Sequence, residues 1–424
     1  MAPSSNPPPL RIAILGGGLA GGAAFRVLSK NENLVVDIFE SAPAFREQGQ
    51  GVGMNPNAMA ALEMLGLLNC LQDAGAVRAP TCRMQIGGGP DAGTFLFDLD
   101  LKETGTHNVH RTPFLSQLYK GMDETRMHVN KKMVRIEEKG EEVVLHFQDG
   151  TTHVCDILLG ADGIRSDTRK YVLGENDPAA EPSFAGWYAV WTCAPIEEAV
   201  KHLGSDLVNI EDTVQYMWFG PDSLVLHNIL SNTKQAQCVL CERVPEDKAA
   251  EWKKTVSKDH LRKLLSTHDS RFHQGIVEMA TRETGDETPM LAFWHHREHA
   301  RTIVKGPIAL LGDAAGTAVP FKGAACGMAM EDVLILSELF KVAKTPKEAR
   351  IALTGYDRVN KPRRQRLVDS SYEVGLLMSL CHPEAGRNIE EIKKRLEHRW
   401  DWLLNVDLQK NVDTALEVLQ QDKR

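Results

Sequence analysis

Three glycines near the N-terminus have the spacing of a phosphate-binding turn. Gly16, Gly18 and Gly21 form the pattern G-x-G-x-x-G. In such a pattern the first glycine permits a tight turn, the second lets the backbone approach a pyrophosphate, and the third lets a helix pack on a strand. Glu40 follows Gly21 by 19 residues, at a distance where a carboxylate accepts hydrogen bonds from a ribose diol. These residues together predict a dinucleotide site.

The elements around these residues are those that such a site needs. Residues 10–15 (LRIAIL) are apolar and favour a strand, residues 23–31 (AAFRVLSKN) favour a helix, and residues 34–40 (LVVDIFE) favour a second strand that ends in Glu40. The length fits one strand–helix–strand unit. Glutamate in place of aspartate at the end of the second strand slightly favours FAD over NAD.

Two further segments each predict a strand, a glycine turn and a helix. In DILLGADGIRSDTRKYV, Asp162 and Gly163 form the turn and Ser166 is the expected cap of the next helix. In GPIALLGDAAGTAVPFKGAACGMAMEDVLILSELF, the turn contains Gly312 and Asp313, and the following helix has an apolar stripe at helical spacing.

The three motifs resemble, in order and spacing, those of the class A FAD-dependent aromatic monooxygenases. The salicylate-hydroxylase-like branch, which includes dearomatising fungal phenol hydroxylases, is the most similar, and the resemblance covers nearly the whole chain. It implies an α/β fold with a Rossmann-like FAD-binding domain of the p-hydroxybenzoate hydroxylase type, an inserted mixed β-sheet substrate domain and a helical C-terminal tail. It also implies a reaction in which NAD(P)H reduces FAD, O2 adds at C4a, and the flavin hydroperoxide hydroxylates a phenolic, polyketide or fused-ring substrate.

The resemblance assigns the ADP half of FAD to the first motif. The residues concerned are Gly16, Gly18, Gly21 and Glu40. Arg46 and Gly53 are assigned to a loop that lines the flavin, where close approach of the backbone to a ring requires glycine.

The remaining cofactor residues follow from the same resemblance. Arg111, in the segment VHRTPFLSQL, is expected to contact FAD. Asp162 belongs to an element that serves both FAD and NAD(P)H. Asp313 is expected to bind the ribityl hydroxyls, and the backbone near Cys326 to reach the ring. A helix starting near Gly323 would direct its positive end at the reduced, anionic flavin.

The substrate residues are expected between 79 and 105 and between 181 and 290. There the chain departs from its relatives. Trp191 stands where many have an arginine that holds a phenolate, and Asn228 where dearomatising relatives have a tyrosine. Gly316 and Phe321–Lys322 replace two histidines. A simple salicylate or phenol substrate is therefore doubtful, and a larger, more apolar ring system is favoured.

The candidate catalytic residues are His227, Lys322 and Trp191. His227 or Lys322 could accept a phenolic proton, although an ordinary solvated loop lysine is the simpler interpretation of Lys322. The pattern H-x-x-E-H in HHREH (residues 295–299) is not expected to bind zinc, because it precedes a strand and not a long helix. No metal site is predicted.

Composition limits the class of protein. The 424 residues carry a net charge of −8 and 42% hydrophobic residues, which argues against a nucleic-acid partner. No apolar run is long enough for a membrane span, and eight scattered cysteines fit a reduced, cytoplasmic protein. A small aromatic substrate is the expected partner, and the protein is expected to be a monomer or homodimer.

The expected organisation is discontinuous. Residues 1–78, 106–180 and 286–350 form the FAD domain, residues 79–105 and 181–285 the substrate domain, and residues 351–424 a helical C-terminal segment. Within the last segment, KKRLEHRWDWLLNVDLQ has the pattern of one amphipathic helix. Two alternatives to aromatic hydroxylation remain open: a related epoxidase or Baeyer–Villiger-type oxygenase, and a FAD-binding protein without turnover.

Overall fold

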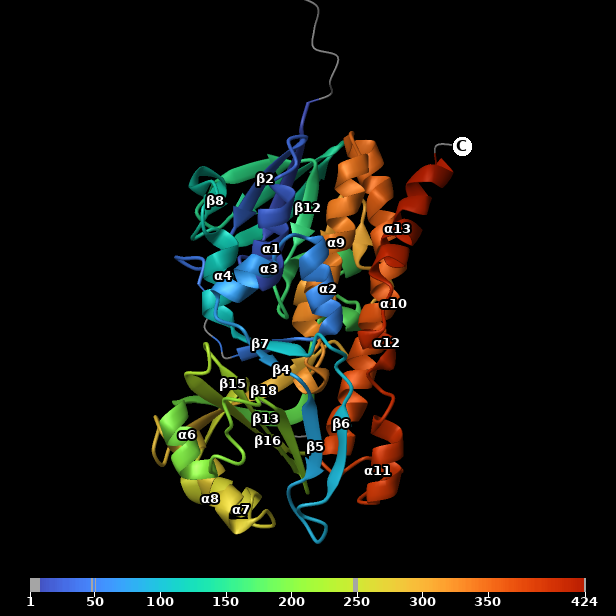
Figure 1. Cartoon of the computed structure of the whole chain (residues 1–424). Helices are drawn as coiled ribbons and strands as arrows, with labels where there is room; N and C mark the ends of the chain where they lie inside the picture. The colour runs from blue at the N-terminus through green and yellow to red at the C-terminus, as the bar shows by residue number, and fades with distance from the viewer. Residues whose placement is uncertain (1–7, 47–48, 50, 247–250, 423–424) are drawn as a thin grey trace, which may run out of the picture.

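The computed structural model of the chain describes residues 8–46, 49, 51–246 and 251–422. Figure 1 shows two parts: an upper one built around a parallel sheet and a lower one built around a larger sheet, with one long helix running along both.

The first sheet is parallel except at one edge. Its strands, in spatial order, are β19 (Val304–Lys305), β20 (Ile308–Leu310), β12 (Ile157–Gly160), β1 (Leu10–Leu15), β2 (Leu34–Phe39) and β8 (Met127–His128), and only β19 pairs antiparallel. The apolar runs of β1, β2 and β12 are almost entirely buried, as expected for parallel strands that are covered on both faces.

Helices and a second small sheet enclose the parallel sheet. The helices are α1 (Leu19–Leu28), α2 (Pro56–Met64), α3 (Leu68–Asp73), α4 (Arg111–Tyr119), α5 (Asp167–Leu173), α9 (Ala325–Val342) and α13 (Leu408–Asp422). The small sheet contains β9 (Met133–Lys139), β10 (Glu142–Phe147) and β11 (Thr152–Cys155).

A three-stranded sheet lies between the two parts of the molecule (Figure 1). Its strands are β3 (Gly51–Met54), β7 (Thr106–His110) and β4 (Val77–Ala79). We call it the bridging sheet.

The eight-stranded sheet forms the lower part. Its strands, in spatial order, are β17 (Lys253–Val256), β18 (Thr288–His295), β13 (Ser183–Pro195), β16 (Gln235–Arg243), β15 (Ser223–Leu230), β14 (Gln215–Gly220), β5 (Cys82–Ile86) and β6 (Phe95–Leu99). All neighbours pair antiparallel except β14 and β5, so the sheet is mixed.

Both faces of the eight-stranded sheet are covered. The outer face, which carries Val190, Val225 and Leu240, packs on α6 (Ile196–Leu203), α7 (Lys258–Leu264) and α8 (Ser270–Thr281). The inner face, which carries Met217 and Val239, packs on residues near Phe321 and on the C-terminal helices.

The long helix α10 (Pro346–Met378) joins the two parts. It packs on α9 and α13 in the upper part, and Gly375 near its end meets the ring of Phe321 in the lower part. The single amphipathic helix predicted after it is wrong. The chain instead forms α11 (Ile389–Leu396), α12 (Asp401–Leu404) and α13, because buried Trp400 and Leu403 turn it back onto the body.

The predicted fold class is confirmed in its main features: a Rossmann-like parallel sheet, a mixed sheet and a helical C-terminus. Residues 286–350 were predicted to belong to the FAD domain, whereas β18, which starts at Thr288, pairs within the eight-stranded sheet. The proposed domain boundaries remain a prediction.

Candidate functional site

The predicted cofactor motifs meet at one edge of the parallel sheet. Strands β1, β2, β12 and β20 run in the same direction, so their carboxyl ends share an edge. Gly16, Glu40, Asp162 and Asp313 follow those four ends within three residues. Ligands of such sheets bind outside the carboxyl ends of the strands.

The first turn has the shape that the glycine pattern requires. Gly16 has φ +101°, a conformation that side-chain-bearing residues rarely adopt. A Cβ atom on Gly21 would lie 1.9 Å from the carbonyl oxygen of Gly16. Helix α1 then begins at Leu19 behind Gly18, and no side chain caps its first N–H groups. These free donors fit a pyrophosphate.

Glu40 is held by the backbone of the same turn. One carboxylate oxygen accepts the Gly17 N–H at 2.7 Å, and the other accepts the Ala42 N–H at 2.7 Å. Each oxygen keeps further acceptor capacity, so a ribose diol can still bind there. Glu40 thereby fixes the turn and can also bind a ribose diol.

Asp162 organises its turn from within. Its carboxylate accepts hydrogen bonds from the Ser166 hydroxyl at 2.5 Å and from the Thr168 N–H at 3.0 Å. Ser166 in turn caps α5 by accepting the Arg169 N–H, which confirms the predicted cap. Beside this turn, the guanidinium of Arg165 lies 3.7 Å from the ring centre of Trp252. The aspartate therefore shapes the loop, and its side chain is engaged inside the protein.

Asp313 follows Gly312 at the same edge of the sheet. Its side chain is open to solvent. The surrounding protein nevertheless desolvates the carboxyl group and raises its pKa, while the charges of Arg364 and Arg111 act in the opposite direction. A carboxyl group that solvent reaches while protein surrounds it is suited to hydroxyl groups of a ligand that binds at this edge. Arg111 and Asp313, predicted from separate motifs, are thus brought together.

The loop before β3 approaches Arg111. A Cβ atom on Gly49 would lie 3.0 Å from Cδ of Arg111. Arg46 is exposed, and its N–H donates to the Ala44 carbonyl at 2.9 Å. Gly53 lies in β3, opposite Asn108 in β7.

Helix α9 begins two residues later than expected, at Ala325. Gly323 has φ +59° and turns the chain into it. No side chain caps the first turn of α9, so its N–H groups are available to a ligand. Cys326 lies in that turn and is half-buried.

His227 does not meet these residues. It lies on the outer face of the eight-stranded sheet, two residues after Val225. Its Nδ1 accepts from Trp218 Nε1 at 3.1 Å, and its Nε2 donates to the Leu207 carbonyl at 2.9 Å. Burial lowers its pKa to about 4. Both ring nitrogens are used within the protein, so this histidine cannot reach a ring on the inner face.

Lys322 is buried, so the interpretation as a solvated loop lysine is wrong. Its side chain is 2% exposed and points toward the C-terminal helices. Nζ donates to Ser370 Oγ at 3.0 Å and to the Arg399 carbonyl, and it lies 5.0 Å from the ring centre of Trp400. Burial, with the charge of Arg399, lowers its pKa to about 7.

Trp191 lies on the inner face. Its ring centre is 5.3 Å from that of Phe293, which is 5.7 Å from that of Phe321. The two residues that suggested a larger, apolar substrate, Trp191 and Phe321, therefore belong to one aromatic cluster.

Sequence reasoning missed a row of amide side chains on the inner face. Gln237 Oε1 accepts the Gly51 N–H at 2.6 Å, Gln237 Nε2 donates to Asn228 Oδ1 at 3.3 Å, and Asn228 Nδ2 donates to Gln215 Oε1 at 3.1 Å. These residues stand side by side on β16, β15 and β14. A signal existed in the sequence, since polar residues in otherwise apolar strands mark such a row.

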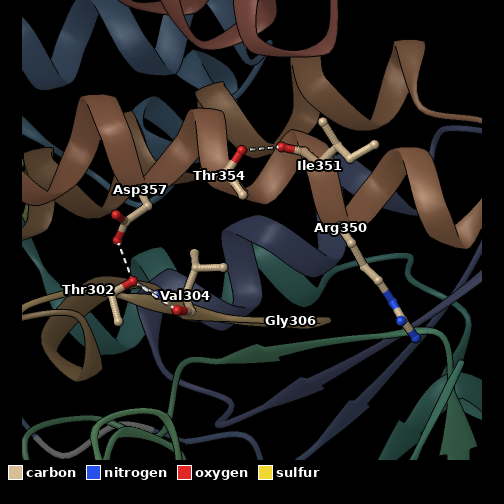
Figure 2. Close-up of a pocket in the computed structure, with 7 residues that line it drawn as sticks. All are labelled: Thr302, Val304, Gly306, Arg350, Ile351, Thr354 and Asp357. Carbon is tan, nitrogen blue, oxygen red and sulfur yellow. Dashed lines mark hydrogen bonds between the residues drawn. The ribbon is translucent and has the colours of Figure 1, made fainter. Parts of the chain in front are cut away.

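One surface hollow lies away from the cofactor motifs. It lies between α10 and the β19–β20 edge, lined by Thr302, Val304, Gly306, Arg350, Ile351, Thr354 and Asp357 (Figure 2). Gly306 precedes β20, so the hollow is at the amino edge of the parallel sheet, opposite the cofactor motifs. Thr302 donates to Asp357 at 2.9 Å across it.

Among the described residues, no helix is long and apolar enough to cross a membrane. They also contain no group of three or more His, Cys, Asp or Glu residues that could hold a metal ion.

Comparisons with known proteins agree with this geometry. A family described as a FAD binding domain matches residues 10–371. Salicylate hydroxylase of Pseudomonas putida is 31% identical over 97% of this chain and 95% of its own. The 6-methylsalicylate 1-monooxygenase atA of Aspergillus terreus is 30% identical over 94% of this chain and 90% of its own. A solved salicylate hydroxylase substrate complex has the same fold, with a TM-score of 0.82, 24% identity, and coverage of 96% of this chain and 98% of that one.

The residues at the carboxyl edge of the parallel sheet fit FAD. The tight turn at Gly16, the uncapped starts of α1 and α9, Glu40 and the open carboxyl group of Asp313 supply what a dinucleotide flavin needs. From the match over most of its length and the geometry of these motifs, the chain belongs to the family with this FAD-binding domain and is a FAD-dependent monooxygenase.

Proposed function

We propose that this monooxygenase hydroxylates an aromatic ring that carries a hydroxyl group, with NAD(P)H as the reductant and O2 as the oxygen source. One observation carries the proposal: the Gly51 N–H donates to Gln237 Oε1 at 2.6 Å. This bond joins the loop assigned to the flavin directly to the inner face of the eight-stranded sheet. A ring bound on that face therefore lies next to the flavin. The names of the two similar relatives, both hydroxylating salicylates, support the same choice.

The chain's own residues bind, orient and exclude water. FAD, when bound, supplies hydride acceptance and oxygen activation, which side chains cannot supply. The turn at Gly16 and Glu40 would hold its ADP half, and Asp313 its ribityl chain. The aromatic cluster of Trp191, Phe293 and Phe321 gives the inner face an apolar wall. Such a wall keeps water away from the reacting ring.

The proposal includes the site residues assigned above and the domain boundaries. It also includes a cytoplasmic location and a monomeric or homodimeric state. The eight cysteines form no disulfide bonds, which supports the cytoplasmic location. Size-exclusion chromatography with light scattering would decide the oligomeric state.

Anaerobic reduction of the bound flavin tests the activity. The FAD-loaded enzyme is mixed with NADPH or NADH in a stopped-flow instrument, with and without phenols, polyketide aromatics and naphthols. We expect one class of ring compound to accelerate flavin bleaching and to yield a hydroxylated product in air. Bleaching without any effect of aromatic compounds would favour the epoxidase or Baeyer–Villiger alternative. A flavin that neither nicotinamide reduces would leave a FAD-binding protein without turnover.

A further inference from the structure

One face of the bridging sheet, which carries both polar and apolar residues, lies against the eight-stranded sheet. On β4 this face carries the buried Val77 and Ala79, opposite Asn108 and Thr106. On β7 this face carries Thr106 and Asn108, and the residue of β3 opposite Asn108 is Gly53. Gly51 lies on the same face of β3, and a Cβ atom there would lie 2.6 Å from Leu230 of the inner face. The side chains on this face therefore lie between the two sheets.

Asn108 is the unusual residue on this face. It is 1% exposed, and neither its Oδ1 nor its Nδ2 has a hydrogen-bond partner among the described residues. Leaving a buried amide unpaired is destabilising, because each group loses the hydrogen bonds that it makes with water in the unfolded chain. A native protein tolerates such a cost where a ligand completes the hydrogen bonds.

The neighbours of Asn108 connect it to the flavin loop. Its Oδ1 lies 3.4 Å from where a Cβ atom on Gly53 would be. On the same face, the Thr106 hydroxyl donates to Asn55 Oδ1 at 2.6 Å, and Asn55 Nδ2 donates to the carbonyls of Lys322 and Gly323, each at 3.2 Å. The amide of Asn108 is therefore located between the loop before α9 and the inner face.

The groups that face Asn108 are uncharged. The inner face offers the amides of Gln237 and Asn228, which bond to one another. The next row of the inner face is apolar, because it contains Leu226 on β15 and Trp191 on β13. His110, on the same face of β7, has its pKa lowered by burial, which favours the neutral ring.

The cations on the described inner face are exposed or already paired. Lys253, on the edge strand β17, is exposed. Arg243, at the far end of β16, donates to Glu246 at 2.8 Å and lies over the Trp187 ring. Burying a carboxylate without a cation is costly, whereas an amide pairs equally well with a hydroxyl and a carbonyl group.

We infer that Asn108 recognises an uncharged hydroxyl or carbonyl substituent of the substrate, so the enzyme selects neutral phenols and aryl ketones over salicylate-type carboxylates. This inference rests on the proposed function and names the substrate class of the same site. Asn108 then acts as a specificity-determining residue that both donates to and accepts from the ring substituent.

A matched pair of probes tests it. The FAD-loaded enzyme is titrated at pH 6.5 with 2′-hydroxyacetophenone and with salicylate, which share a ring and an ortho hydroxyl group. Binding is followed by the flavin absorbance, without turnover. We expect the neutral ketone to bind at least about 10-fold more tightly, the effect of roughly one well-placed hydrogen bond.

Variants of similar size separate the role of Asn108 from its packing. Asn108→Leu should weaken ketone binding about 10-fold and leave the salicylate Kd within about two-fold. It should not lower the melting temperature, because it removes an unpaired amide. Gln85→Met is the control, since Gln85 Nε2 is also buried without a partner among the described residues but Gln85 pairs with Trp218, away from the bridging sheet. It should leave both Kd values unchanged.

Several results would overturn the inference. They are tighter binding of salicylate, undetectable binding of both probes, and an unchanged ketone Kd in Asn108→Leu. A loss of FAD affinity in that variant, measured by flavin fluorescence, would instead assign Asn108 to the cofactor. Reduction of the flavin by NADPH with stimulation by salicylate would sustain the proposed function while rejecting the inference, so the two can fail separately.

Discussion

Arg364 on α10 forms an ion pair with Asp332 on α9, and both side chains are almost completely buried. Asp332 also accepts the Gly312 N–H at 2.8 Å and the Asn360 amide at 2.8 Å. The turn that carries Asp313 is therefore anchored by two helices that follow it in the chain. The ion pair explains how α10, a helix late in the chain, supports the cofactor site.

Removing Arg364 should damage both stability and cofactor binding. Arg364→Ala leaves the Asp332 carboxylate buried without its cation, which typically costs about 3–5 kcal/mol. Urea unfolding with and without FAD measures the loss. Arg366→Ala is the control on the same helix, because Arg366 lies over the Trp402 ring, and it should cost less than about 1 kcal/mol. Equal losses in the two variants would show that the buried pair does not anchor the turn.

Glu40→Gln should weaken FAD binding by about 10- to 100-fold. The two carboxylate oxygens accept N–H groups on both sides, from Gly17 and Ala42. The amide nitrogen of glutamine must face one of these donors, which distorts the turn. Fluorescence titration of the apoprotein with FAD gives the Kd. Exposed Glu32→Gln is the charge-matched control, and an unchanged Kd in Glu40→Gln would reject the role assigned to Glu40.

Lys322 should make the free energy of unfolding change with pH in the alkaline range. Its folded pKa of about 7 lies below the ordinary 10.5, mainly because of burial. Between these values the unfolded chain binds more protons than the folded one, so the free energy of unfolding rises with pH. The penalty for the buried charge is present in full below pH 7.

The variant Lys322→Met tests this dependence. Between pH 7.5 and 9.5 the wild-type protein should gain roughly 2 kcal/mol relative to the variant. Urea unfolding across this range measures the difference. Lys30→Met, at an exposed position, should follow the wild-type curve. Parallel curves for wild type and Lys322→Met would mean that the amine is not buried as a titrating group.

Trp191 should favour fused rings. Because its ring extends the apolar wall next to Phe293, wild-type protein should bind 2-naphthol at least about 10-fold more tightly than phenol. Trp191→Ala should reduce this ratio to below about three-fold. Phe95→Ala removes a ring that is 55% exposed and should leave the ratio unchanged. An unchanged ratio of the two Kd values in Trp191→Ala would show that the substrate ring does not bind beside Trp191.

The cofactor edge was predictable because its determinants are local. The apolar runs of β1 and β2 and the glycines of the first turn specify a strand, a turn and a helix within 31 residues, from Leu10 to Glu40. Parallel pairing then places the separate motifs at one edge, whatever lies between them. The assignment of Arg111 and Asp313 to one site came instead from the resemblance to the aromatic monooxygenases, because β7, which precedes Arg111, lies outside the parallel sheet.

The inner face was not predictable, since it depends on which side of a strand meets which layer. Both faces of β15 are buried, so the alternation of polar and apolar residues that usually marks the solvent side is absent. His227 and Asn228 are adjacent in sequence but lie on opposite faces. The burial of Lys322 depends on Trp400, 78 residues later in the chain, and no local pattern reports such a contact.

The position of α10 has a consequence for how the protein is made. The first glycine turn leaves the ribosome early, whereas the partner of Asp332 is residue 364 of 424. Before α10 has emerged, Asp332 of α9 can already accept the Gly312 N–H, but its carboxylate lacks its cation. Synthesis proceeds from the N-terminus, so the turn that carries Asp313 gains its full set of supporting contacts only after α10 has been made.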